Sequence, residues 1–126
     1  MIRWSDYPNF TEYEMACPDC GVSNISKHFM EKLQKARNIA GIPFRMSEGS
    51  ACRCIKHNEE VDGVSDSAHL STESLKCQAG DIPIRNTREK FIVVTALLEA
   101  GFTRIGVYDT WIHADCSLHK DQKVMW

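Results

Sequence analysis

The sequence lacks any long hydrophobic run and any strong excess of charge of one sign. No stretch approaches the roughly 18 consecutive apolar residues that a membrane-spanning helix needs, so we expect no membrane partner. Fifteen Lys and Arg against 17 Asp and Glu give a formal net charge of −2 with no basic block, which argues against a nucleic-acid partner. Residues 1–8 contain no basic region followed by an apolar run, so no secretory signal peptide is expected.

Proline and glycine are sparse, with four and seven residues, and they form neither a linker nor a repeat. The chain has 126 residues, of which 43% are hydrophobic and 25% are charged, and this composition is typical of a globular protein. We therefore expect a single domain over residues 1–126, acting as a monomer.

Six cysteines and five histidines are many for a chain of this length. Cys17 and Cys20 form a Cys-x-x-Cys pair, and Cys52 and Cys54 form a Cys-x-Cys pair. Such close pairs suit the tetrahedral coordination of zinc, whereas a chain made in a reducing cytosol rarely keeps disulfides. A second zinc site, disulfides and buried free thiols all stay open as interpretations of these four residues.

Capping signals and apolar periodicity predict four helices. They cover residues 11–17, 24–40, 54–61 and 86–101. Thr11 with Glu14 forms a capping box, Ser26 caps the second helix, and Asn86 with Glu89 caps the last. The expected core face of the last helix consists of Phe91, Val94, Thr95 and Leu98.

Short runs of alternating or β-branched residues predict strands at residues 42–46, 79–84, 103–108 and 111–116. Asp109 and Thr110 form a compact turn between the last two strands, so we expect a hairpin there. Residues 62–77 are rich in Ser, Asp and Thr and predict a long loop. The fold class is therefore α+β, with a small, mostly antiparallel sheet and flanking helices.

Three polar motifs lie on or beside the predicted strands of the second half. They are Ser67-Ala68-His69, Ala79-Gly80-Asp81 and Trp111-Ile112-His113-Ala114-Asp115. Because side chains alternate along a strand, Trp111, His113 and Asp115 share one face. A strand His with a distant His and Asp can form a three-ligand zinc site that leaves one position open for water.

Four motifs together resemble the M15 zinc peptidases, the family of D-alanyl-D-alanine carboxypeptidases and L-alanyl-D-glutamate endopeptidases. They are residues 50–58 (Ser-Ala-Cys-Arg-Cys-Ile-Lys-His-Asn), 67–69, 79–81 and 112–115. Their order is similar to that of the small phage and bacterial branch, and the resemblance runs from about residue 10 to residue 116. It implies a hedgehog/DD-peptidase-like fold.

The resemblance also implies roles for individual residues. Zinc would be bound by His69, Asp81 and His113, and Arg53 would hold a carboxylate or carbonyl of the substrate. Ser67 and Trp111 are expected to line the substrate cleft. The remaining histidines, His28, His57 and His119, are expected to be ordinary polar surface residues.

Two departures from the family pattern concern the ligand spacing and the general base. Eleven residues separate His69 from Asp81 where the family usually has six, which predicts an insertion within residues 71–77. Many members carry an acid three residues before the last histidine, but Thr110 stands there. We favour Asp109 as the base, and we expect Asp115 to orient a ligand histidine, with a catalytic role as the second choice.

The function that this resemblance implies is zinc-dependent hydrolysis of a peptide bond in peptidoglycan stem peptides, with a metal-bound water as nucleophile. Without a signal peptide, the chain would be made in the cytoplasm and would reach the bacterial cell wall as a phage lysis or tail enzyme, or by another export route. The alternative is a non-catalytic, hedgehog-like, zinc-containing binding module, because the acid is missing at position 110.

Overall fold

The computed structural model describes residues 2–126. The chain forms a 3-10 helix η1 (Trp4–Asp6) and helices α1 (Glu12–Met15), α2 (Lys27–Ala40), α3 (Ile55–Glu60) and α4 (Thr87–Glu99). The strands are β1 (Ala79–Pro83), β2 (Arg104–Val107), β3 (Trp111–Asp115) and β4 (Val124–Met125). None of the helices in this described range is long and apolar enough to span a bilayer.

The helix starts follow the capping residues that the sequence predicts. The side chains of Thr11, Ser26 and Asn86 each accept a hydrogen bond from a backbone N–H in the first turn of their helices. Gly41 ends α2 with φ of 68°, a left-handed conformation that favours glycine. Cys54 caps α3 through its sulfur, which accepts from the N–H of His57. All four predicted helices are confirmed.

The sheet has the order β1-β3-β2-β4. β3 pairs antiparallel with both β1 and β2, and the predicted hairpin of β2 and β3 is confirmed. β4 pairs parallel with β2, and this strand was not predicted because two residues carry no periodicity. The α+β class and the mostly antiparallel sheet are therefore confirmed.

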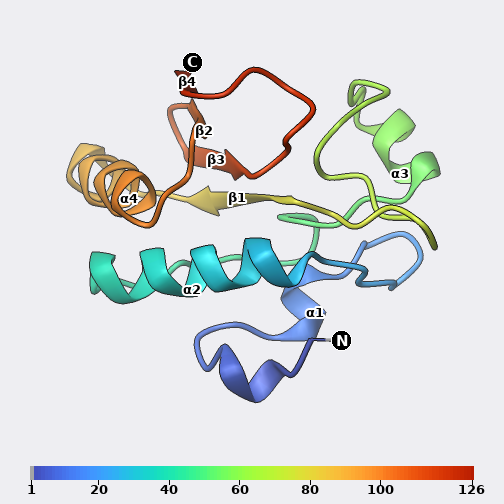
Figure 1. Ribbon diagram of the computed structural model, residues 1–126, viewed down its shortest axis with the longest axis horizontal. Coiled ribbons are helices and arrows are strands. Elements are labelled where there is room, and N and C mark those ends of the chain that lie inside the picture. The colour runs from blue at the N-terminus through green and yellow to red at the C-terminus, as the bar shows by residue number, and fades with distance from the viewer. Residues whose placement is uncertain (1) are drawn as a thin grey trace.

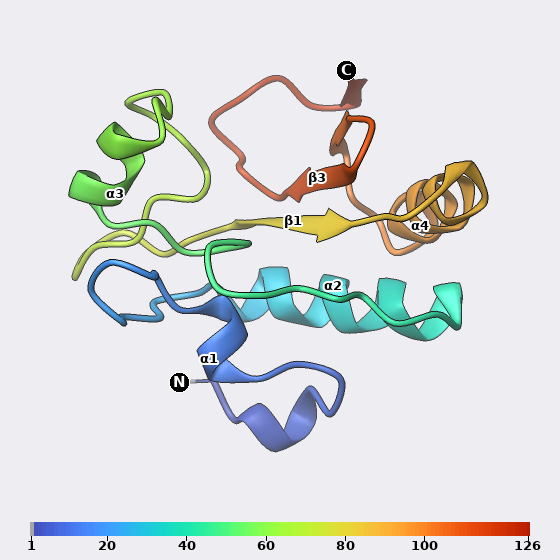
Figure 2. The ribbon, with the colours of Figure 1, turned by 180° about the vertical axis from the view of Figure 1, so that it is seen from behind.

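The sheet separates a packed side from an open side. Gly80 of β1 faces α2, because an added Cβ there would come within 3.0 Å of Phe29. Ile82 and Ile112 belong to the same hydrophobic core. α2 runs beneath β1 and α4 covers one end of the sheet, whereas α3 and the loop after β3 lie on the opposite side (Figures 1 and 2). Asp81 and His113, which alternate with the core residues, face that opposite side.

Two predictions about packing are wrong. Residues 42–46 form no strand; they are an irregular segment that buries Phe44 and Met46 in the core. The core face of α4 is also different, since Phe91 is 72% exposed and Leu98 is 52% exposed. The residues that α4 buries are Glu89, Val93, Ala96 and Leu97. Residues 91–98 are apolar almost all round the helix, so periodicity alone could not select the buried face.

Candidate metal centre

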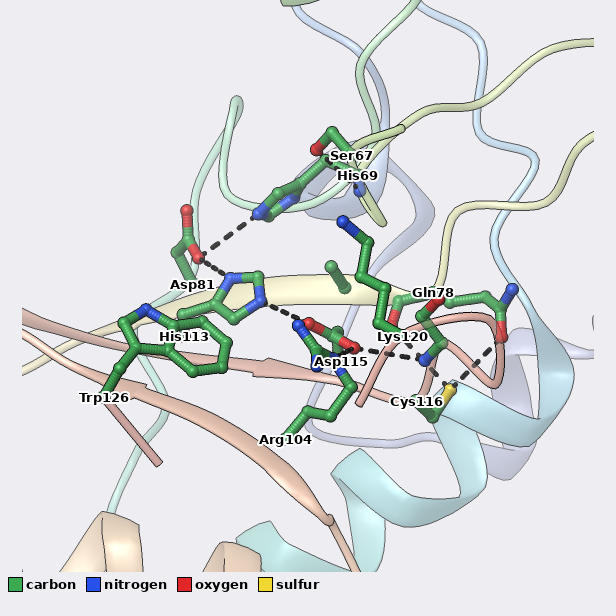
Figure 3. Close-up of polar contacts among 12 residues, drawn as sticks. Ser67, His69, Gln78, Asp81, Arg104, His113, Asp115, Cys116, Lys120 and Trp126 are labelled. Atoms are coloured by element: carbon green, nitrogen blue, oxygen red, sulfur yellow. Dashed lines mark hydrogen bonds and ion pairs between the residues drawn. The ribbon is translucent and has the colours of Figure 1, made fainter. Parts of the chain in front are cut away.

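Three side chains from separate parts of the chain converge on the open side of the sheet. His69 comes from the long loop, Asp81 from β1 and His113 from β3, and one ligand atom of each lies within 4.8 Å of the others. Asp81 and His113 are direct partners in the antiparallel register. Oδ1 of Asp81 is 2.9 Å from Nδ1 of His113 and 3.3 Å from Nε2 of His69 (Figure 3). We call these three residues the His–Asp centre.

His69 is held from behind by backbone groups. The residue is 4% exposed, and its Nδ1 donates to the carbonyl oxygen of Ala51 at 2.7 Å. Its backbone is fixed as well, because the N–H of Arg53 donates to the His69 carbonyl and the N–H of Ser71 donates to the Arg53 carbonyl, both at 2.8 Å. The proton on Nδ1 leaves the lone pair of Nε2 free toward Asp81.

His113 is held from behind by a buried carboxylate. Its Nε2 donates to Oδ2 of Asp115 at 2.7 Å. The other oxygen of Asp115 accepts from Nε of Arg104 at 2.8 Å and from the N–H of Ser117 at 3.1 Å. Figure 3 shows the resulting chain of contacts from His69 through Asp81 and His113 to Asp115. Nδ1 of His113 therefore faces Asp81, so both histidines present one nitrogen to the same point.

The charges in the His–Asp centre stabilise one another. Burial acts to raise the pKa of Asp81, but its contacts with His113 and His69 outweigh it and hold this pKa well below its usual range. Burial acts to lower the pKa of His113, but Asp115 and Asp81 raise it. Burial likewise acts to raise the pKa of Asp115, and the contacts with His113, Ser117 and Arg104 lower it. Both carboxylates are therefore ionised at neutral pH.

The His–Asp centre lies in a cleft of about 400 Å³. Arg53, Ser67 and Trp111, which the sequence places in the substrate cleft, all line it. Nη2 of Arg53 lies 3.9 Å from Oδ2 of Asp81, so the guanidinium borders the centre itself. Trp111 is 39% exposed and stacks on Tyr108 with ring centroids 4.4 Å apart, which makes this pair an aromatic wall of the cleft.

The structure separates the two candidates for a catalytic acid. Asp115 lines the cleft and contacts His113. Asp109 lies exposed in the hairpin turn and is not among the residues that line the cleft. Within residues 2–126, the carboxylates lining the cleft are those of Asp81 and Asp115. The geometry thus gives no support to Asp109 as the base, and that assignment stays a prediction.

The sequence did not indicate four of the polar and aromatic side chains that line the cleft. They are Arg104, Tyr108, Lys120 and Trp126. The parallel pairing of β4 brings Trp126 beside the centre, where its ring lies 5.6 Å from that of His113 and its Nε1 donates to the Tyr108 hydroxyl at 2.7 Å. Arg104 could have been found, because the predicted hairpin pairs it directly with Asp115. No pattern in residues 116–126 indicated Lys120 or Trp126.

The remaining histidines are mostly as expected. His28 and His119 are exposed, whereas His57 is half-buried and its ring nitrogen lies 3.8 Å from Glu60.

A family model described as Peptidase M15 matches residues 8–115. The matched range contains the whole His–Asp centre together with Arg53 and Asp115. No curated protein and no solved structure was found to be similar to the chain.

Proposed function

The chain belongs to the Peptidase M15 family, and we propose that it is a zinc-dependent peptidase that cleaves peptidoglycan stem peptides at the bacterial cell wall. The convergence of His69, Asp81 and His113 within 4.8 Å at the base of a cleft carries this proposal. The expected route to the wall is that of a phage lysis or tail enzyme or another export route, and the expected state is a monomer.

The donor set fits zinc. Two imidazole nitrogens and one carboxylate oxygen match the three protein ligands of a catalytic zinc site, and the cleft gives access to a fourth position. The proton on each distal nitrogen is accepted by Ala51 or Asp115, which sets the tautomer that a ligand histidine needs. When bound, zinc would polarise the scissile carbonyl and lower the pKa of a water.

The side chains of the cleft supply the other parts of the proposed reaction. Asp115 orients His113 and balances its charge, and it acts through that residue as a positioning group. Arg53 presents a planar guanidinium at the edge of the centre, which suits a carboxylate or carbonyl of the substrate. Tyr108, Trp111 and Trp126 provide apolar walls for the peptide. A short acidic peptide suits these walls and this cation, and the D-residue near its scissile bond is what the family resemblance implies.

The test is digestion of purified peptidoglycan by the zinc-loaded protein, with released fragments identified by mass spectrometry. Loss of a terminal D-alanine indicates a carboxypeptidase, and cleavage between L-alanine and D-glutamate indicates an endopeptidase. His113→Ala is expected to lose both zinc and cleavage. The proposal is overturned if His113→Ala loses the zinc of the His–Asp centre but still releases the same fragments.

A non-catalytic binding module is the second candidate. It is favoured by one observation: both carboxylates that line the cleft, Asp81 and Asp115, are already engaged with histidines. A zinc-loaded protein that sediments with cell walls but releases no fragment would support this function instead.

A further inference from the structure

Of the two cysteine pairs in the sequence, only Cys17 and Cys20 stay together in the structure. The sulfur atoms of Cys17, Cys20 and Cys54 lie within 4.8 Å of one another, although 37 positions separate Cys17 from Cys54. Cys52, the neighbour of Cys54 in the Cys-x-Cys pair, is instead fully buried and contacts the thiol of Cys77. We call Cys17, Cys20 and Cys54 the thiol cluster.

Backbone N–H groups converge on the sulfur atoms of the thiol cluster. Sγ of Cys17 accepts from the N–H of Cys54 at 3.4 Å, and the N–H groups of Asp19 and Cys20 also point to it. Sγ of Cys54 accepts from the N–H of His57 at 3.4 Å. Donors directed at sulfur favour the thiolate, which is the form that binds metals. Burial acts to raise the pKa of Cys17, but these N–H groups lower it. The N–H of His57 acts to lower the pKa of Cys54, but burial and the contacts with Cys17 and Asp19 raise it to about 11, so a metal bound there would displace the thiol proton.

The backbone turn of residues 17–21 brings its two cysteines to one point. The N–H of Gly21 donates to the carbonyl of Cys17 at 2.8 Å, and Gly21 has φ of 74°, which a residue with a Cβ rarely adopts. The loop that contains this turn lies at the same end of the molecule as α3, which Cys54 precedes (Figures 1 and 2). Two cysteines of a tight turn and a third from a distant segment match the ligand spacing of structural zinc sites.

We propose that the thiol cluster binds a second metal ion, a structural zinc that is separate from the His–Asp centre. Three thiolates select a soft or borderline ion such as zinc over magnesium or calcium. Asp19 is the candidate for the fourth ligand: its Oδ2 lies 3.5 Å from Sγ of Cys54, and a turn of this carboxylate toward Cys17 and Cys20 would complete the set, since it does not belong to the group of atoms within 4.8 Å. Its other oxygen lies 3.6 Å from Nζ of Lys56, which limits the negative charge of this ligand set.

This site would fix the segment that supports the proposed active site. Cys54 directly follows Arg53, whose N–H and carbonyl are paired with the loop of His69. Ala51, three positions before Cys54, accepts the hydrogen bond that orients the His69 ring. A metal at the thiol cluster therefore ties residues 17–21 to the chain that positions both Arg53 and His69. The metal site itself does not depend on the proposed peptidase activity.

The experiment measures zinc per chain by elemental mass spectrometry in the full-length protein purified under reducing conditions. We expect two zinc ions in the wild type and one in Cys20→Ser, a substitution of an exposed residue that leaves the core intact. Cys52→Ser is the matched control, because it changes the other half of the Cys-x-Cys pair. Its polar neighbours, Ser71 and Ser23, suit a hydroxyl, and this variant should keep two zinc ions.

Cobalt substitution keeps the outcome independent of the His–Asp centre. Cobalt bound by thiolates gives an intense charge-transfer absorption, which we expect in the wild type and in His69→Ala but not in Cys20→Ser. Asp19→Ala should weaken metal binding without removing the band. The proposal is overturned if the wild type gives no such band, or if alkylation and mass spectrometry show a Cys17–Cys20 disulfide in place of a metal.

Discussion

The His–Asp centre and the thiol cluster bring three potential ligands together in different ways. In the His–Asp centre, Asp81 and His113 face each other across two paired strands, and each histidine is bonded from behind by a separate acceptor. In the thiol cluster, a tight turn and the start of α3 meet, and the bonds to sulfur come from the ligands' own backbone segments. A catalytic metal site leaves one coordination position open for water or substrate. Its three protein ligands must therefore be held in place by hydrogen bonds to other groups. A closed structural site can let the metal itself organise its loops.

The largest effect is expected from Asp81→Ala, which removes the proposed carboxylate ligand of the metal, the group that contacts both histidines. The two imidazoles alone bind zinc weakly, so we expect cleavage of peptidoglycan to fall roughly 1000-fold or more. The zinc of the thiol cluster should stay bound. Fragment release and zinc per chain measure the two results separately, and loss of both metals together would break the distinction between the two regions.

The support behind the His–Asp centre is tested by Asp115→Asn, with Asp109→Asn as the matched control. Asp115 is buried and orients His113 by accepting its hydrogen bond. Replacing this carboxylate by the amide of Asn should therefore lower zinc affinity or activity about 10- to 100-fold. Asp109 is exposed in the turn and should tolerate the same change within roughly twofold. Zinc titration and kinetics on both variants compare them. A larger loss from Asp109→Asn would restore Asp109 as the base.

Local patterns predicted most of the fold, and the resemblance to the M15 peptidases selected His69, Asp81 and His113, whose ligand atoms the structure brings within 4.8 Å of one another. Thr11, Ser26 and Asn86 cap helices in the structure as the sequence indicates, because capping depends on neighbours within one turn. The hairpin of β2 and β3 is equally local, since one short turn sets it.

Tertiary packing decided the features that the sequence could not predict. The buried face of α4 depends on what packs against a helix that is apolar nearly all round. Trp126 reaches the cleft only through the two-residue strand β4, whose pairing with β2 carries no sequence signal. The separation of Cys52 from Cys54 likewise follows from long-range contacts and not from their spacing.

A smaller effect on activity is expected from the thiol cluster. Cys20→Ser should lower the melting temperature, because a metal that binds only the folded state stabilises it. Activity should fall only about 2- to 10-fold, since Arg53 and His69 keep their backbone pairing. Thermal unfolding of Cys20→Ser and Cys52→Ser, each with and without chelator, measures this. Chelator should not lower the melting temperature of Cys20→Ser as far as that of the control. Equal shifts in both would remove the stabilising role of the cluster.

The smallest expected effect is a pH dependence that differs between the metal-free and zinc-loaded protein. Burial acts to lower the pKa of His113, but Asp115 and Asp81 raise it. A histidine with a raised folded pKa contributes stability that is complete below its unfolded value of about 6.5 and is lost as pH rises through the folded pKa. Asp81 and Asp115 have lowered pKa values, so their contribution is lost only in acid, below the unfolded value of about 3.9.

Between about pH 8 and pH 6, acidification should therefore raise the melting temperature of the metal-free protein through His113. The same change should weaken zinc binding, because the proton competes for Nδ1 of His113. Melting curves of the metal-free wild type and of His113→Asn measure the first effect, and the variant should show a flatter pH profile. Zinc titrations across the same range measure the second. Parallel melting profiles in the two proteins would mean that the contacts with Asp81 and Asp115 do not raise the pKa of His113. The His–Asp centre and the thiol cluster would then differ in the chemistry of their ligands and not in how those ligands are held.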